Sequence, residues 1–515
     1  MTGLAKQPLP EGVVAVVKRD CPTCELVAPV LDDLARRGLE LTVFTQDDPL
    51  FPEGSATVVD DTQLAMSWSH DIETVPTMMK VQDGQETERI VGWSRSQWEA
   101  FTGQTHLGPD LPEQRPGCGS LSCDPSMVDL LTVRFSGSSL TSRRIELARL
   151  EDEIEAGFDR GWSDGLPVVP PTEARVLRML EGTTRQPDEV IAIVPPDLNE
   201  VTVEQIAINA VLAGAKPEYL PVILTAVEAA CTDEFNMHGL IATTFFSGPI
   251  LIVNGPITNR IGMNSGANVL GQGNRANLTI GRTLQLVVRN LGGGRPPISK
   301  TPHPPDPTTP GVSPDGQTPL ASAANGIDMA LMGSPSKLGL CFAEREFDSP
   351  FDPLATHMGL DPGVDAVTIY AGQGPTAIVD QLSRTPESLA RSMAGVLAVT
   401  FHPKLVIGFD AMLVVGPEHG RIFRQAGWDR ARLSQELDEL LTLDSDRLLR
   451  GVDGIDEGLP VELAGNRLPK FRPGGLQIVH AGGDAGLFSA VLGGWVGGPK
   501  GSIPVARRIG GVPQR

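Results

Sequence analysis

The sequence predicts a protein of the α/β class, on three observations. Its 515 residues exceed what one typical domain needs, so two or three domains are expected. The apolar, β-branched run from Val13 to Val17 is typical of a buried strand, and the residues after it favour a helix that ends near Arg37. Between Val190 and Leu492 the order of strand, glycine-rich loop and helix recurs several times, which predicts a large domain with a parallel or mixed sheet.

The predicted domains follow the changes in composition along the chain. Residues 1–104 are predicted to form a first domain, and residues 141–515 a large α/β domain of one or two lobes. Between them, residues 105–140 are rich in glycine and proline and are predicted to be a linker that carries a pair of cysteines. Gly, Pro and Ser are so frequent in residues 103–127 that neither a helix nor a strand is expected there.

Cys21 and Cys24 stand at the start of the first predicted helix. The first turn of a helix has unpaired N–H groups and the positive end of the helix dipole, and both stabilise a thiolate on Cys21. Cys24 follows one turn later, within reach to resolve a mixed disulfide on Cys21. Both are therefore candidate catalytic cysteines. A zinc site is the less favoured alternative, because the sequence has no second CxxC pair.

Three further features accompany this motif. Pro29 follows the second cysteine by five residues, Val75-Pro76 precedes an apolar run, and Gly92 precedes a predicted helix. Together with the CxxC motif, these features make residues 8–104 resemble the thioredoxin and glutaredoxin superfamily. The resemblance implies a thioredoxin-like domain in which Pro76, in the place of the family's cis-proline, faces the dithiol and shapes the substrate groove.

Two positions differ from the thioredoxin pattern. The dipeptide between the cysteines is Pro22-Thr23, which is closer to a glutaredoxin, and Ala15 stands where thioredoxins keep a buried aspartate. These differences affect the expected redox potential and proton pathway, but not the dithiol chemistry itself. The alternative is a degenerate thioredoxin fold that serves as a docking module.

Cys118 and Cys123 form the second close pair of cysteines and are further catalytic candidates. The glycines on both sides of Cys118 permit another backbone or thiol to come close. Arg115 would favour a thiolate on Cys118, whereas Asp124 would oppose one on Cys123. We predict a redox pair that exchanges electrons with the first dithiol and presents them to the large domain. The alternative is two incidental cysteines in a loop.

In the large domain, the candidate site residues are polar groups that follow predicted strands. His419 stands at a strand-to-helix junction, where an imidazole is well placed for acid–base catalysis. His480 also follows a predicted strand. The Gly/Asn-rich segment 261–277 runs into a helix, so it is either a cradle for an anion or polar ligand or turn-rich scaffolding. The predicted substrate-binding residues are Pro76, Asn254, Asn274, Arg275, Asn277 and Glu344.

Charge and hydropathy limit the partners of the chain. The net charge of −21, without a cluster of Lys and Arg, argues against nucleic acid or an anionic membrane surface as a partner. No signal peptide is recognised, and no segment reaches the roughly 20 apolar residues that cross a bilayer. We therefore expect a cytoplasmic protein. The glycine-rich tail from Arg472 to Arg515 is expected to pack against a neighbouring lobe or subunit, and we expect a homo-oligomer. No cofactor is expected, and no metal, because the histidines lack the paired spacing of metal ligands.

These features predict a thiol-dependent oxidoreductase. The first dithiol would pass electrons to a site with Cys118 and Cys123, which serves a pocket for a small-molecule substrate in the large domain. A cellular thiol or a reductase would supply the electrons. The region from Gly161 onward resembles uncharacterised bacterial proteins that pair with redox-active cysteine or selenocysteine proteins, and this implies no particular activity. The alternatives are a non-redox lyase or hydrolase that the dithiol regulates, and a thiol-switch interaction protein.

Overall fold

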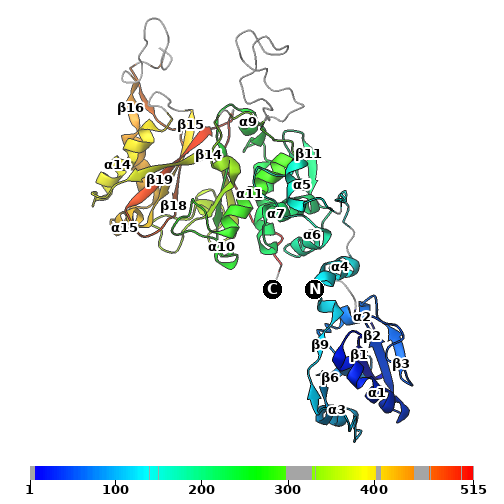
Figure 1. The fold of residues 1–515 in the computed structure, drawn as a ribbon. Helices are drawn as coiled ribbons and strands as arrows, with labels where there is room; N and C mark the ends of the chain where they lie inside the picture. The colour runs from blue at the N-terminus through cyan, green and yellow to red at the C-terminus, as the bar shows by residue number, and fades with distance from the viewer. Residues whose placement is uncertain are drawn as a thin grey trace, which may run out of the picture. The chain divides into compact units, whose positions relative to one another are not determined.

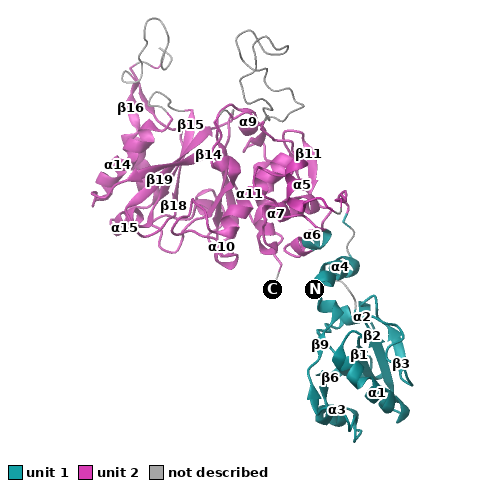
Figure 2. Cartoon of the chain, viewed as in Figure 1, with its two compact units in different colours: residues 1–140, 173–177 teal, residues 141–172, 178–515 magenta. Residues whose placement is uncertain are grey.

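The structure is a computed structural model, and it describes residues 6–137, 140–148, 150–296, 328–330, 332–401, 408–445, 463, 465–499 and 501–513. Helices and strands are combined in the α/β architecture that the sequence predicts. The chain divides into two compact units (Figure 2). The first comprises Met1–Leu140 and Glu173–Leu177, and the second comprises Thr141–Thr172 and Arg178–Arg515.

The first unit is built on a five-stranded sheet with the strand order β3-β2-β1-β5-β6 (Figure 1). Strands β1, β2 and β3 are parallel, and β5 runs antiparallel to β1 and β6. The central strand β1 is buried from Val13 to Val17, because an uninterrupted apolar run fits a strand that is covered on both faces. The strands are β1 (Gly12–Val17), β2 (Leu41–Thr45), β3 (Thr57–Asp60), β5 (Thr77–Gln82) and β6 (Gln85–Val91).

The helix after β1 completes the core of this unit. Val27 and Leu31 on this helix, α1, belong to the same buried cluster as Val14 and Val16 of β1. The apolar face of the helix therefore fixes its first turn at the end of the central strand. The described helices of this unit include α1 (Pro22–Arg36), α2 (Ala65–Ser69), α3 (Arg95–Thr102) and α4 (Pro125–Phe135).

The segment 103–127 contains regular structure. The sequence-based expectation that it would hold no helix and no strand is therefore wrong. Two very short strands in it, β8 and β9, pair antiparallel with β7 and β4. Each has only two residues, so it is held by its partner strand rather than by a propensity that the sequence would reveal. The bounds are β4 (Thr74–Val75), β7 (Trp93–Ser94), β8 (Gln114–Arg115), β9 (Cys118–Gly119) and the 3-10 turn η1 (Leu121–Cys123).

The second unit contains a mixed seven-stranded sheet, in agreement with the predicted fold class. The order is β13-β12-β14-β19-β15-β18, and β20 pairs with β14. Strands β12 and β13 are parallel, as are β15 and β18, whereas β14 and β19 are antiparallel to their neighbours. The strands are β12 (Gly248–Asn254), β13 (Leu340–Ala343), β14 (Ala366–Val379), β15 (Phe409–Val415), β18 (Leu476–His480), β19 (Phe488–Val496) and β20 (Val505–Arg508).

Both faces of this sheet are buried. In β15, Leu413 and Val415 join a cluster with helices α14, α15 and α16, while Met412 and Val414 join a second cluster with residues of β12 and β13. Figure 1 shows α14 beside one end of the sheet and α11 beside the other. The larger helices are α7 (Val203–Ala213), α8 (Leu220–Ala230), α11 (Arg275–Asn290), α14 (Pro386–Val399), α15 (Pro417–Gln425) and α16 (Arg430–Leu440).

The remaining elements are short. They are α5 (Glu153–Asp159), α6 (Glu173–Leu180), β10 (Val190–Val194), β11 (Asn199–Thr202), η2 (Pro217–Tyr219), α9 (Met237–Ala242), α10 (Ile257–Arg260), α12 (Ser336–Gly339), α13 (Leu354–His357), β16 (Thr442–Asp444) and β17 (Arg467–Pro469). Among the described residues, no helix combines the length and the apolar character that a membrane span requires.

Candidate active site

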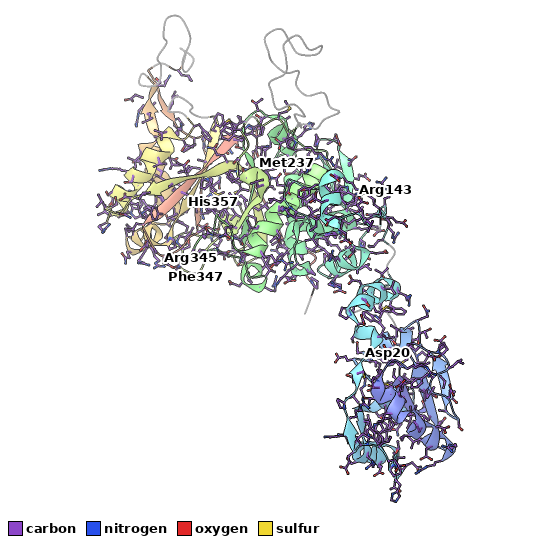
Figure 3. The ribbon with its side chains drawn as sticks, viewed as in Figure 1. Asp20, Arg143, Met237, Arg345, Phe347 and His357 are labelled. Atoms are coloured by element: carbon purple, nitrogen blue, oxygen red, sulfur yellow. The ribbon has the colours of Figure 1, made fainter. Side chains whose placement is uncertain are left out.

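Cys21 is the N-cap of helix α1. Its backbone is extended, and its sulfur accepts a hydrogen bond from the Cys24 N–H at 3.2 Å. Pro22 takes the first helical position, where the N–H that proline lacks has no helical partner anyway. Asp20, labelled in Figure 3, immediately precedes this cap. Both cysteine side chains are buried, with 1% of Cys21 and 0% of Cys24 exposed.

Cys118 lies against this dithiol. Strand β9 pairs antiparallel with β4 in the register Val75 to Cys118, and the Val75 carbonyl oxygen is 3.6 Å from the Cys21 sulfur. The Cys118 thiol is close enough to the Cys21 sulfur to lower its pKa. The structure therefore brings three of the predicted catalytic cysteines into one cluster, although Cys118 is distant from the other two in sequence.

The thiols of Cys21, Cys24 and Cys118 differ in pKa. Hydrogen bonding from the Cys24 thiol lowers the pKa of Cys21 to about 5, against the opposing effect of burial, and the Cys118 thiol adds to this lowering. Burial, with the hydrogen bond to Cys21, raises the pKa of Cys24 far above its ordinary value. The pKa of Cys118 is also raised, first by burial. At neutral pH the cluster therefore holds one thiolate, on Cys21, and two thiols that donate to it.

The segment that carries Cys118 is bonded to the first unit at several points. We call residues 114–123 the strap. The Thr23 hydroxyl donates to the Pro116 carbonyl at 2.7 Å, and the Ser120 N–H donates to the Glu73 carbonyl at 2.9 Å. The Gln46 amide donates to the Ser120 hydroxyl at 2.6 Å and accepts from the Leu121 N–H at 3.0 Å. These bonds hold Cys118 in its register opposite β4.

Two glycines allow the strap to lie this close. A Cβ atom on Gly117 would lie 2.4 Å from Thr74 Cγ2 and 2.7 Å from the Val75 oxygen. Gly92 has a φ of +70°, and a Cβ atom there would lie 3.0 Å from the Gly117 nitrogen. A side chain at either position would force the strap away from the dithiol. Gly119, by contrast, has open space where its Cβ would be.

The other residues predicted around the dithiol have different surroundings. Cys123 is exposed, and its thiol donates to the Ile72 carbonyl at 3.7 Å; none of its interactions in the described chain is with another cysteine. Arg115, expected to favour the Cys118 thiolate, lies in β8 and pairs there with Trp93. The cation that lowers the pKa of Cys118 is Lys18, whose only signal in the sequence is its position just before the CxxC motif.

Pro76 and Asp124 also have defined partners. The Val75–Pro76 peptide bond is cis, and the Pro76 carbonyl accepts a hydrogen bond from the Gly92 N–H at 2.7 Å. Asp124 is the N-cap of α4 and accepts from the Ser126 N–H at 2.8 Å. Its carboxylate therefore caps the N-terminus of α4.

In the second unit, Asn254 and Glu344 meet at the carboxyl edge of the sheet. The Asn254 amide donates to the Glu344 carboxylate at 2.7 Å, and the Leu354 N–H donates to the same oxygen at 2.7 Å. Burial raises the pKa of Glu344 to about 7, although Arg430, 3.9 Å away, acts in the opposite direction. Arg345 and Phe347, labelled in Figure 3, belong to the loop that follows Glu344. This edge holds a carboxyl group that can exchange a proton near neutral pH.

His419 does not join this group. It is fully buried, with Nδ1 2.8 Å from the Ser489 hydroxyl and Nε2 3.0 Å from the Asp380 carbonyl oxygen. Both ring nitrogens are thus occupied inside the protein. We therefore correct its predicted acid–base role to a structural one: it ties the start of α15 to β19 and to the end of β14.

The predicted ligand cradle before α11 uses its polar groups internally. Asn274 caps α11 by accepting from the Asn277 N–H at 3.0 Å, and Asn277 donates to the Asn264 carbonyl at 2.9 Å. The Arg275 guanidinium donates to the Gly214 carbonyl at 2.9 Å. These bonds fix the loop, so the scaffolding alternative describes the segment better than a ligand cradle.

Two further expectations for the chain concern the absence of a metal and the presence of a substrate pocket. Within the described chain, no group of three or more His, Cys, Asp or Glu side chains is placed to hold a metal ion. A recess of about 810 Å³ in the second unit is lined by α16, Thr442 and Arg467, and none of the predicted site residues lines it. No protein-family model matches the chain, and no curated protein matches it significantly.

Proposed function

We propose that the chain is a thiol–disulfide oxidoreductase in which Cys21 and Cys24 reduce an oxidised form of Cys118. The observation that carries this proposal is the position of Cys118, which pairs in register with Val75, the residue whose carbonyl oxygen lies 3.6 Å from the Cys21 sulfur. The lowering of the Cys21 pKa to about 5 supports it. We also infer that the first unit is a thioredoxin-like domain. The CxxC motif at the start of α1 and the neighbouring cis Val75–Pro76 bond support this inference.

The proposed electron transfer has three steps. Cys118 passes its proton to the Cys21 thiolate and attacks a low-molecular-weight disulfide RSSR, which forms a mixed disulfide between Cys118 and R and releases RS⁻. The released RS⁻ takes the proton back from Cys21 and leaves as RSH, so Cys21 is again a thiolate. The Cys21 thiolate then attacks the Cys118 sulfur, which forms a Cys21–Cys118 disulfide and releases RS⁻. Cys24 finally attacks Cys21 and transfers its proton to the departing Cys118 thiolate. The dithiol has become a disulfide, and RSSR has been reduced to RSH and RS⁻.

The remaining parts of the proposal concern the source and use of the electrons. A cellular thiol or reductase would reduce the Cys21–Cys24 disulfide, and the second unit would bind the small molecule that is turned over. The non-redox alternative has one observation in its favour, the raised pKa of Glu344, because a carboxyl group with a pKa of about 7 can act as an acid or a base. That alternative predicts an activity that survives the Cys118→Ser substitution.

Trapping tests the transfer directly. The Cys24→Ser variant, treated with hydroxyethyl disulfide and mapped by mass spectrometry, should accumulate a Cys21–Cys118 disulfide, because the resolving thiol is absent. A Cys24→Ser/Cys123→Ser variant should give the same product. A hydroxyethyl adduct on Cys21 with Cys118 still a free thiol would contradict the proposal, as would a Cys118–Cys123 disulfide.

A further inference from the structure

The edge of β4 is where a polypeptide substrate would reach the dithiol. Extended polypeptides bind proteins by adding a strand to an open sheet edge, so that main-chain hydrogen bonds align one of their side chains with the site. Val75 in β4 is the residue whose carbonyl oxygen lies 3.6 Å from the Cys21 sulfur. A strand paired with Val75 would therefore present its own cysteine to Cys21. In this structure, β9 of the strap is that strand, and Cys118 is that cysteine.

The strap is fitted to this edge by more than the strand pairing. Gln46 is 1% exposed, and its amide group bonds to Ser67, Ser120 and the Leu121 N–H. The Ser122 hydroxyl donates to the Ile72 carbonyl at 2.6 Å. Lifting the strap would break these buried hydrogen bonds together, and buried polar groups left without partners are costly.

When the strap is paired with β4, it also limits which sulfur atoms Cys21 can attack. Disulfide exchange places the attacking sulfur, the attacked sulfur and the leaving sulfur in line, so the leaving group needs room beyond the attacked atom. Cys21 and Cys24 are buried, whereas Cys118 is partly exposed. An oxidised Cys118 offers its sulfur to Cys21 on one side and its leaving group to solvent on the other.

We propose that the strap occupies the position of a polypeptide substrate, so that the dithiol reduces low-molecular-weight disulfides through Cys118 and excludes disulfides of folded or unfolded proteins. This inference rests on the proposed function, since it assigns the substrate class of the same site. The strap is thus a specificity element: an incoming protein would have to displace it from β4 before its disulfide could reach Cys21.

The test compares two probes in single-turnover reactions of the reduced full-length chain. Hydroxyethyl disulfide is the small probe, and insulin is the protein probe. The wild-type chain should reduce hydroxyethyl disulfide at least about tenfold faster than insulin per disulfide bond, because the strap blocks strand addition. Equal rates on the two probes would overturn the proposal whatever the variants do.

Two glycine substitutions provide a matched pair. Gly117→Ala places a methyl group 2.4 Å from Thr74 and should loosen the strap, whereas the Gly119→Ala methyl meets open space. Gly117→Ala should raise the rate on insulin about tenfold, as a tenfold larger open fraction requires. Gly119→Ala should behave like the wild-type chain. If Gly117→Ala prevents folding, Gln46→Ala serves instead, because it removes the bonds to Ser120 and Leu121.

The proposed electron relay through Cys118 and the proposed exclusion of protein substrates by the strap can be refuted separately. With Cys118→Ser, the proposed function predicts a large fall in the rate on hydroxyethyl disulfide, while the strap still predicts slow reduction of insulin. Full activity of Cys118→Ser on the small probe would refute the relay alone. The substrate exclusion alone would be refuted by a different result in the folded Gly117→Ala and Gln46→Ala variants. In that case amide exchange at Ser120 would show that the strap is loosened, but the rate of insulin reduction would stay unchanged.

Discussion

Cys21 in the first unit and Cys341 in the second are almost equally buried, with 1% and 3% of their surfaces exposed, yet their thiols differ sharply. Burial alone raises the pKa of Cys341 far above its ordinary value, and it raises that of Cys231 to about 12. The pKa of Cys21 is lowered to about 5 because thiols and N–H groups donate to its sulfur. Removal from water therefore makes a thiol inert unless donors stabilise the thiolate.

The largest difference in activity is expected between a substitution of Cys21 and a substitution of Cys341. Cys21→Ser should reduce the reaction with hydroxyethyl disulfide to the background rate, because a serine hydroxyl does not take part in disulfide exchange. Cys341→Ala should keep the wild-type rate within about twofold, since its thiol stays protonated at neutral pH. The measurement is the single-turnover rate at pH 7. A Cys341→Ala variant that loses the reaction while remaining folded would break the comparison.

Glu344 offers a second comparison, between a buried thiol that has become easier to ionise and a buried carboxyl group that has become harder to ionise. Its folded-state pKa of about 7 exceeds the ordinary 4.5, so its contribution to stability is complete below pH 4.5 and is lost as the pH rises through 7. The difference between these pKa values corresponds to about 3 kcal/mol.

Glu344→Gln should remove this part of the pH dependence. Relative to the variant, the free energy of unfolding of the wild-type chain should fall by about 3 kcal/mol between pH 4.5 and pH 8.5, measured by urea denaturation. The Gln side chain keeps an oxygen that can accept from Asn254 and Leu354, so the hydrogen bonds on that side are retained. If the free energies of unfolding of the two chains change with pH in parallel, Glu344 ionises as an ordinary carboxyl group and the prediction is wrong.

Part of this arrangement can be predicted from the sequence. The α/β class, the mixed sheet and the position of Cys21 at a helix start follow from periodicity and from the CxxC spacing. The glycines around Cys118 correctly indicated that another chain segment comes close, and Gly117 is the one that requires it. Asn254 ends β12 and Glu344 directly follows β13, and these two strands are parallel neighbours, which explains why the two residues meet.

The rest depends on partners that are remote in sequence. His419 and Glu344 both follow strands, but Ser489 and the Asp380 carbonyl occupy the His419 ring, and neither contact leaves a local pattern. Strand β9 has two residues and no hydrophobic alternation, so its pairing with β4 is invisible before folding. The pKa of Glu344 depends on burial that only the packed second unit creates.

The contact between Cys118 and the Cys21 thiolate is the central claim, and thiolate absorbance near 240 nm tests it most directly. Hydrogen bonds to a charged group contribute about 1.5 kcal/mol or more, so Cys118→Ala should raise the pKa of Cys21 by about one pH unit. Cys123→Ala should leave the midpoint near pH 5, as in the wild-type chain. If Cys118→Ala titrates with the same midpoint as the wild-type chain, the two sulfurs are not in contact and the proposed relay is wrong.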